Sequence, residues 1–352
     1  MSLPATFEAG GRAIGAGHPS YLIAEAGSNH NRDLGIAKRL IDVSADAGAD
    51  AVKFQTYSGD RLYSRRAESK YLDQYGADSP AELLERIALP REWHAELAEH
   101  ARGRGIHFFS SPFDHEAIDE LAEVGVPLLK IASGEIVDLP LIRKAASTGI
   151  PLIVSTGMAS LAEVGEAVAA AEEAGATALA LMQCASVYPA APELINLRAM
   201  HTLRDEFGVP AGLSDHTTGI VVPAAAAALG AAMIEKHITL DRSMEGPDHS
   251  FAIEPDELAA MVTAVRDAEA ALGDGRKEGP SEAERDENYV LARRSLIAAR
   301  DLAAGTVIEA DMLTVKRPGS GIAPKHFDDV VGQTLAQNVE ADDVLTWEMF
   351  PR

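Results

Sequence analysis

The sequence predicts a (βα)8 TIM barrel followed by a small, mostly-β domain. Short apolar runs alternate with amphipathic stretches over most of the chain, which is typical of βα units that build a parallel sheet. Eight such runs can be found, and the 352 residues suit a barrel of about 250 residues with an appendage. A doubly wound open sheet is the alternative, but it usually has fewer strands, and no GxGxxG motif follows the first run.

The predicted strands share a pattern in which an apolar start is followed by polar or ionisable residues. They span residues 21–27, 51–57, 107–113, 128–134, 151–157, 179–186, 211–217 and 233–240. Helical stretches lie between them, for example residues 34–49 and 161–176. Gly175 suits the left-handed backbone conformation that commonly ends a helix, here the helix of residues 161–176. The last helix of the barrel is predicted over residues 254–273.

The composition of the chain changes twice toward its end. We assign residues 1–275 to the barrel, and residues 276–292, which are polar and rich in Gly and charge, to a linker. Residues 293–352 contain short β-like runs separated by Gly, Pro and Asp. A domain of that size buries little apolar surface alone, so we expect it to dock on another surface.

Charge and cysteine usage limit the possible partners. The formal net charge of −23 disfavours nucleic acid and anionic membranes, although local Lys and Arg side chains can still build a pocket for an anion. No uncharged apolar run is long enough to span a membrane, and the first residues lack the pattern of a signal peptide. The single cysteine, Cys184, fits a reducing compartment, so we expect a cytoplasmic protein.

The polar residues at the predicted strand ends indicate an active site. In a barrel the carboxyl ends of the strands face one mouth, where these side chains would converge. Any one of them could be an ordinary buried polar group, but a complete ring of them favours a site. The polar residues at the strand ends are Glu25, Lys53, Gln55, Ser110, Ser111, Lys130, Ser133, Ser155, Thr156, Ser186, Tyr188, Asp215, His216, Glu235, Lys236 and His237.

Two histidines at the ends of consecutive predicted strands suggest a metal site. His216 ends the seventh strand and His237 ends the eighth, so both rings can point into the mouth. Neutral imidazoles are good ligands for Mn²⁺, Fe²⁺, Co²⁺ or Zn²⁺. No cysteine pair is present, so an open, partly hydrated site is favoured over a closed structural zinc site. Asp215 is a weaker candidate that could orient His216.

Two lysines lie inside apolar strand sequences, in AVKFQ and LLKIA. A buried lysine is costly unless it meets an anion, so Lys53 and Lys130, with Ser133 and Ser155 nearby, suit a small ligand that carries a phosphate and a carboxylate. A Schiff-base lysine is a second interpretation. A third is a pair of buried salt bridges with Glu25 and Glu135 as the partners.

Several further residues are candidates for proton transfer or for sugar binding. Glu25, Glu135 and Asp248 can act as general acid or base, or hold sugar hydroxyl groups. Tyr188 can donate to a sugar or phosphate oxygen. In the tail, Arg317 lies on a turn shaped by Pro and Gly, and is either a surface arginine or a group that reaches a substrate.

These residues together resemble the sialic acid synthase family, which includes the N-acetylneuraminate, legionaminate and pseudaminate synthases. The matching segments cover nearly the whole chain in the family's order. They include AEAGSNHN, FFSSPFD, LKIASGEI, IVSTGMA, QCASVYP, GLSDHT, IEKHITLD, GPDHSF and VKRPGSGI. The resemblance implies an N-acetylneuraminate-type synthase, a transferase that forms a carbon–carbon bond between phosphoenolpyruvate and an N-acyl hexosamine and releases phosphate by C–O cleavage.

The resemblance also implies roles for individual residues. His216 and His237 would hold a divalent metal, with Mn²⁺ favoured and Mg²⁺ or Co²⁺ as alternatives. Phosphoenolpyruvate would be held by Lys53, Lys130, Ser133, Ser155 and Ser186. The sugar and the attacking water would be surrounded by Glu25, Gln55, Glu135, Tyr188 and Asp248. The tail resembles the family's antifreeze-like (SAF) domain, which in a domain-swapped homodimer would cover the partner's barrel and place Arg317 near the sugar.

The sequence leaves the identity of the acceptor sugar undecided. In some members that make N-acetylneuraminate, an Asn stands where this chain has Ser186. N-acetylmannosamine is favoured, and its 6-phosphate or a 2,4-diacetamido-6-deoxy sugar is the alternative. A pyruvate aldolase on the same fold and a glycan-binding protein are hypotheses of other classes. The aldolase would be trapped by borohydride on Lys53 or Lys130, whereas a binding protein would have no need of paired histidines beside buried lysines.

Overall fold

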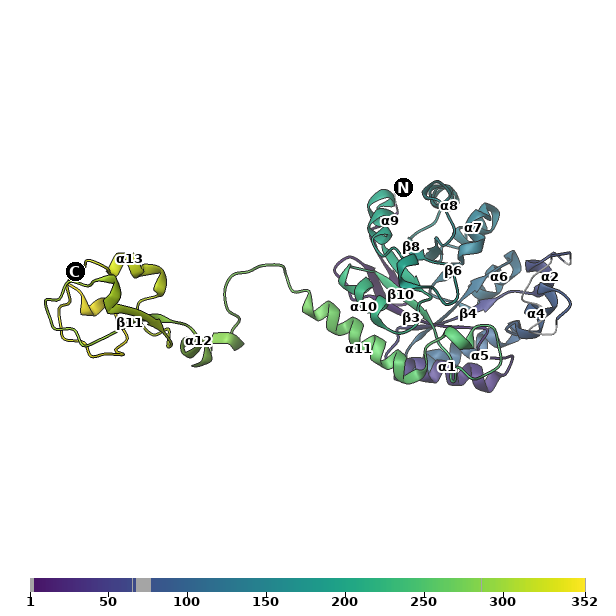
Figure 1. The fold of residues 1–352 in the computed structure, drawn as a ribbon. Coiled ribbons are helices and arrows are strands. Elements are labelled where there is room, and N and C mark those ends of the chain that lie inside the picture. Colours follow the sequence, from purple (N-terminus) through teal and green to yellow (C-terminus); the bar gives the residue numbers. More distant parts are fainter. Residues whose placement is uncertain (1–2, 65, 68–76, 286, 352) are drawn as a thin grey trace. The chain divides into compact units, whose positions relative to one another are not determined.

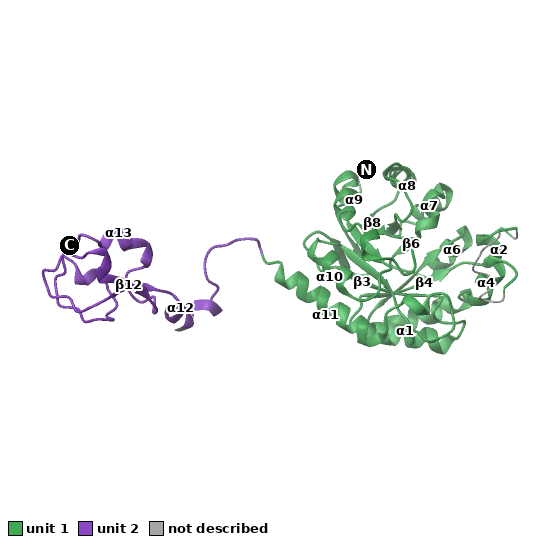
Figure 2. Cartoon of the chain, in the orientation of Figure 1, with its two compact units in different colours: residues 1–273 green, residues 274–352 purple. Residues whose placement is uncertain are grey.

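The chain folds into two compact units. A computed structural model describes residues 3–64, 66–67, 77–285 and 287–351. The division falls between residues 273 and 274, which is two residues before the end of the predicted barrel segment (Figure 2). Within the described residues, no helix is both long and apolar enough to cross a membrane.

The first unit is built on a closed barrel of parallel strands that confirms the predicted fold class (Figure 1). The strands follow one another around the barrel in chain order, and the last pairs with the first. They are β3 (Tyr21–Gly27), β4 (Ala51–Thr56), β5 (His107–Pro112), β6 (Leu129–Ile131), β7 (Leu152–Ser155), β8 (Leu179–Cys184), β9 (Ala211–Asp215) and β10 (Met233–His237). Nearly every strand residue is buried, as expected for a parallel sheet that is covered on both faces.

Helices surround the barrel and are capped by the local sequence. In α8 the Ser160 side chain and Glu163 form a reciprocal capping box, and Asp33 accepts a hydrogen bond from the amide of Ile36 at the start of α1. Among the described residues, the helices of the first unit are α1 (Leu34–Asp46), α2 (Gly59–Leu62), α4 (Pro80–Ile87), α5 (His94–Gly103), α6 (His115–Val124), α7 (Leu139–Ala146), α8 (Leu161–Glu173), α9 (Ala199–Phe207), α10 (Val221–Ala228) and α11 (Pro255–Ala271). Short 3₁₀ turns include η2 (Ser133–Val137) and η4 (His249–Phe251).

An antiparallel hairpin that the sequence analysis did not predict precedes the barrel. It consists of β1 (Thr6–Ala9) and β2 (Arg12–Gly15), joined by two glycines. Gly10 and Gly11 both have positive φ angles, which a tight two-residue hairpin turn requires. The hairpin is held to the barrel by an ion pair between Arg12 and Asp50 and by His107, which contacts the carbonyl oxygen of Gly10.

The second unit has its own hydrophobic core. Its sheet pairs β11 (Ser295–Ala298) with β12 (Leu313–Lys316), and isolated bridges join further segments. Two short helices accompany it, α12 (Glu287–Ala292) and α13 (Phe327–Val330); α12 lies inside the segment for which a linker was predicted. The core contains Leu296, Ala298, Leu302, Ile308, Leu313, Ile322, Val330, Leu335, Val339, Leu345 and Phe350.

Candidate active site

The carboxyl ends of the barrel strands surround a small cavity. Its volume is only about 50 Å³ because charged side chains pair with one another across it. It is lined by Glu25, Lys53, Gln55, Ser111, Lys130, Ala132, Ser133, Ser155, Cys184, Tyr188, Ser214, His216, Glu235 and His237. Most of the predicted site residues therefore share one cavity.

A buried ion network forms the floor of this cavity. Nζ of Lys53 lies 2.8 Å from Glu25 and 3.8 Å from Glu235. Nζ of Lys130 lies 2.8 Å and 3.0 Å from the two oxygens of Glu235. Ser111 and Ser214 add hydrogen bonds to Lys53 and Glu235, respectively. Glu25 is thus a partner of Lys53, as the salt-bridge interpretation expected, but the carboxylate shared by the lysines is Glu235 and not Glu135.

The protonation states of Glu25 and Glu235 leave a net positive charge on the network that they form with Lys53 and Lys130. Burial raises the pKa of Glu25, although Lys53 opposes the rise. Burial acts in the same direction on Glu235, but Lys130 and Lys53 outweigh it and hold its pKa below the usual value. Glu235 is therefore ionised, whereas Glu25 loses its proton only at a higher pH than an ordinary carboxyl group. Two ammonium groups around one firmly ionised carboxylate attract a further anion.

Hydroxyl groups converge around Gly157, beside the lysines. A Cβ atom on Gly157 would lie 2.4 Å from Oγ of Ser186 and 2.7 Å from Oγ of Ser133, so a larger residue here would displace these hydroxyl groups. The amide of Gly157 donates to Ser133 over 3.1 Å. Oγ of Ser186 is buried and has no hydrogen-bond partner among the residues that the structure describes. We call the Ser133 and Ser186 hydroxyl groups around Gly157 the Gly157 cup. These hydroxyl groups can donate hydrogen bonds to an oxygen of a phosphate group.

The two predicted metal ligands lie side by side. The ring centroids of His216 and His237 are 5.3 Å apart. Nδ1 of His216 is 2.8 Å from the carbonyl oxygen of Ala185; if this nitrogen carries the proton, Nε2 is left as an acceptor. Nδ1 of His237 is buried without a hydrogen-bond partner in the described part of the chain. The ring of Tyr188 packs over His216 at 4.1 Å and reaches His237 at 6.0 Å.

These donors fit a divalent transition metal with open positions. The described residues hold no cluster of three or more His, Cys, Asp or Glu side chains arranged as ligands, so water or substrate would have to complete the coordination. That donor set differs from the closed, four-ligand set of a structural zinc site. Asp215 was expected to orient His216, but its carboxylate bonds Thr217 and Lys236 and does not contact the His216 ring directly.

Asp248 joins the site from the loop after β10. A Cβ atom on Gly27, which has a φ of +50°, would lie 2.9 Å from Asp248, 3.5 Å from His237 and 3.6 Å from Glu25. These three side chains therefore surround the same glycine. Ser28 holds Asp248 by a hydrogen bond of 3.1 Å. Nε2 of Gln55 donates to Glu25 over 2.7 Å, which places Gln55 in the same group.

Two predicted residues are not brought into this cluster. Glu135 lies on η2, half-buried, and burial raises its pKa to about 7. Arg317 belongs to the second unit, where it is exposed on a turn. Oγ of Ser295 braces this turn by donating to the carbonyl oxygen of Pro318 and accepting from the amide of Gly321.

Sequence reasoning missed two polar residues of the cavity wall and gave two others no role. Cys184 and Ser214 were not predicted, whereas Ser111 and Glu235 were recognised only as polar residues at strand ends. The missing signal was strand alternation, because residues two apart on a strand face the same side. Since His237 faces the mouth, Glu235 must do so too.

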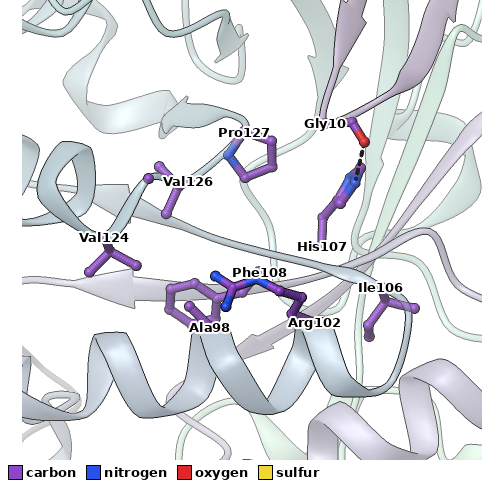
Figure 3. A pocket seen from close by; sticks show the side chains of 10 residues that line it. Gly10, Ala98, Arg102, Ile106, His107, Phe108, Val124, Val126 and Pro127 are labelled. Carbon is purple, nitrogen blue, oxygen red and sulfur yellow. Dashed lines mark hydrogen bonds between the residues drawn. The ribbon is translucent and has the colours of Figure 1, made fainter.

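A larger cavity, of about 290 Å³, lies at the opposite end of the barrel (Figure 3). Gly10, Arg102 and His107 contribute to its wall beside mostly apolar residues. Both ring nitrogens of His107 are engaged, one with the hydroxyl group of Tyr21 and the other with the Gly10 carbonyl oxygen. Arg102 is paired with Glu99. Size alone therefore does not identify the site, and the charged chemistry lies in the smaller cavity.

Comparisons with known proteins find relatives that match most of the chain. A model of the NeuB family matches residues 40–277, and a model of the SAF domain matches residues 293–351. An N,N'-diacetyllegionaminic acid synthase of Legionella pneumophila is 43% identical, with 95% of each chain covered. One of the same name from Campylobacter jejuni is 40% identical over 92% of this chain and 98% of its own. A crystal structure of an N-acetylneuraminic acid synthetase from Leptospira borgpetersenii is 36% identical, covers 82% of this chain and 96% of its own, and superposes with a TM-score of 0.71.

Proposed function

The chain belongs to the NeuB family, and on that premise we propose that it condenses phosphoenolpyruvate with an N-acyl hexosamine and water to give a nonulosonic acid and phosphate. The observation that carries the proposal is the pair of buried lysines, Lys53 and Lys130, which share one firmly ionised carboxylate, Glu235. This arrangement leaves positive charge for an anionic substrate beside the paired histidines.

In the proposed reaction, the lysines hold the anionic groups of phosphoenolpyruvate. Lys53 and Lys130 neutralise the carboxylate and the phosphate, and hydroxyl groups at the Gly157 cup, from Ser133 and Ser186, donate to phosphate oxygens. Ser155 lines the same cavity. Fixing the phosphate and the enol carbon relative to the sugar aldehyde removes the entropy cost of bringing two reactants together.

His216 and His237 would hold a divalent ion, for which we favour Mn²⁺. Nitrogen donors suit Mn²⁺ or Co²⁺ better than Mg²⁺, which prefers oxygen ligands. When bound, such an ion supplies Lewis acidity at the aldehyde oxygen of the open-chain sugar.

The proposed reaction forms one carbon–carbon bond and one carbon–oxygen bond, and breaks the bond between C2 and the bridging oxygen. The C3 carbon of phosphoenolpyruvate bonds to the aldehyde carbon, whose oxygen gains a proton. A water oxygen bonds to C2 and loses one proton, which balances the proton gained by the aldehyde oxygen. The C2–O bond to phosphate then breaks, the bridging oxygen leaves with phosphate, and the second proton of the water passes to phosphate as the C2 carbonyl forms. Glu25 and Glu135, whose pKa values burial raises, can give or accept protons near neutral pH, while Gln55, Tyr188 and Asp248 surround the sugar.

We also expect a second copy of the chain to complete the site. Large apolar side chains are exposed in the segments that directly follow β6 to β9, at the same end of the barrel as the cavity. They are Val137, Met158, Val187 and Val221. An exposed apolar rim of this kind suits protein contact, and the tail unit of a partner carrying Arg317 is the proposed occupant. The single, buried cysteine fits our expectation of a cytoplasmic location.

The test is phosphate release from phosphoenolpyruvate with Mn²⁺ against a panel of acceptors. N-acetylmannosamine is the acceptor favoured by the sequence analysis, and a 2,4-diacetamido-6-deoxy sugar is favoured by the two relatives described above. N-acetylmannosamine 6-phosphate completes the panel. Release that requires both metal and one sugar supports the proposal and identifies the acceptor. Pyruvate turnover without phosphate release would instead indicate an aldolase.

A further inference from the structure

Each candidate metal ligand directly follows one member of a buried ion pair. Asp215 precedes His216 at the end of β9, and Lys236 precedes His237 at the end of β10. Asp215 and Lys236 are register partners in the barrel sheet, and Nζ of Lys236 lies 2.6 Å from Oδ2 of Asp215. Their side chains are 0% and 2% exposed, respectively. The pair therefore joins the two ligand-bearing strand ends in a place that water does not reach.

The same pair fixes the turn that carries His216. Oδ1 of Asp215 accepts from the amide of Thr217, and Oδ2 accepts from its hydroxyl group, both over 3.0 Å. Lys236 donates to the carbonyl oxygen of Thr217 over 2.5 Å. Thr217 is thus held through all three of its polar groups. His216 therefore lies between Asp215, a member of the ion pair, and Thr217, which the pair holds.

The turn at His216 is also bonded to the loop that follows β8. His216 accepts a hydrogen bond from the amide of Ala190 on its own carbonyl oxygen, and its ring contacts the carbonyl oxygen of Ala185. Ala185 and Ala190 bracket the segment that carries Ser186 and Tyr188. A shift of the turn at His216 would therefore move the ring and the neighbouring loop together.

Alternation along the strands separates the pair from the cavity. Adjacent residues face opposite sides, so Asp215 and Lys236 are absent from the cavity wall that His216 and His237 line. A buried ion pair is weak evidence of stabilisation, because apolar residues of similar volume often do as well. Its best-attested use is to specify one arrangement.

We propose that Asp215 and Lys236 are positioning residues that set the separation of the His216 and His237 rings and thereby the affinity for the divalent metal. The inference rests on the proposed function, because it concerns the same metal site. Mutation of a residue that holds a metal ligand in place typically lowers metal affinity by about 10- to 100-fold.

The test measures Mn²⁺ binding, by electron paramagnetic resonance of the free ion, in the double variant Asp215→Asn/Lys236→Met. This change removes both charges together and leaves neither one buried alone. We expect affinity to fall by about 10- to 100-fold. The matched control is Asp50→Asn, which disrupts ion pairs with Arg12 and Arg266 at the other end of the barrel and should lower the melting temperature without changing Mn²⁺ affinity.

Each outcome decides between the alternatives. Wild-type affinity in a folded double variant, with a melting temperature lowered as in Asp50→Asn, would overturn the proposal and leave a purely structural pair. Should the double variant not fold, Thr217→Val replaces it, because it removes only the hydroxyl group that Asp215 accepts from. Weaker Mn²⁺ binding in that variant supports the proposal, and unchanged binding overturns it. Absence of Mn²⁺ binding by the wild-type protein would refute the metal site itself, and the positioning role with it.

Discussion

Nζ of Lys130 lies 2.8 Å and 3.0 Å from the two carboxylate oxygens of Glu235, and both side chains are buried in the floor of the cavity. Glu235 is also 3.8 Å from Lys53. Glu235 therefore contacts both proposed substrate-binding lysines and is the main partner of Lys130, while Lys53 also pairs with Glu25 at 2.8 Å. These contacts make Glu235 a sensitive place to test the charge balance of the site.

Glu235→Gln should destabilise the free protein and increase the stabilisation that phosphoenolpyruvate provides. Removing one partner of a buried ion pair costs about 3–5 kcal/mol, because the other charge is left uncompensated. A bound anion then supplies the missing negative charge. Thermal melting with and without phosphoenolpyruvate measures both effects. Glu135→Gln is the control, since Lys53 and Lys130 pair with Glu25 and Glu235 instead. An equal ligand-induced shift in Glu235→Gln and wild type would argue against an anion site at the lysines.

His237→Ala should abolish metal binding and turnover together. We expect turnover to fall by at least about 100-fold, because polarising the acceptor's oxygen is worth several kcal/mol. Treatment of the wild-type protein with a chelator should have the same effect and be reversed by Mn²⁺. His94→Gln is a matched control, since His94 is also buried but contacts Thr56. Full activity of His237→Ala after chelation would show that the ligand assignment is wrong.

The pH dependence of kcat/KM should contain a limb near pH 7 that belongs to Glu135. Burial raises the pKa of Glu135 to about 7, so this carboxyl group is largely neutral below pH 7 and ionised above it. If Glu135 accepts a proton in the reaction, the rate rises with pH through this range and falls as pH drops below it. Glu135→Gln should flatten the limb at saturating Mn²⁺. Persistence of the limb in that variant would assign it to another group.

Arg317→Ala should raise the KM for the acceptor sugar by about 10-fold or more, the loss expected for a hydrogen bond from a charged donor. The fold should be unaffected, because Ser295 braces the turn and the Arg317 side chain is exposed. Steady-state kinetics and circular dichroism measure the two quantities. Arg300→Ala, which loses a surface ion pair with Asp311, is the control. An unchanged KM would make Arg317 an ordinary surface arginine.

The fold was predictable because parallel barrel strands are buried on both faces and leave continuous apolar runs. The strand predicted over residues 21–27 coincides with β3, whereas that over 128–134 shortens to β6, because the chain turns into η2 at Ser133. The hairpin of β1 and β2 was missed because its four-residue strands carry little pattern, although the Gly10–Gly11 turn was a usable signal.

The site was predictable at the level of strand ends but not of pairing. The ending Glu235–Lys236–His237 contains three ionisable residues, and only alternation from a known inward residue separates the cavity-facing ones from Lys236. Which carboxylate meets Lys130 depends on contacts across the barrel, between β6 and β10, that no local pattern encodes. For that reason Glu135, two residues after Ser133, was considered in place of Glu235.

The most direct test of the proposed chemistry follows the bridging oxygen of phosphoenolpyruvate. The substrate is labelled with ¹⁸O between C2 and phosphorus and converted with Mn²⁺ and the acceptor identified by the panel. Mass spectrometry then locates the label. Condensation with C–O cleavage predicts that the label leaves with phosphate and that the C2 hydroxyl oxygen of the sugar acid comes from water. Label retained in the organic product, whether sugar acid or pyruvate, would contradict the proposed reaction.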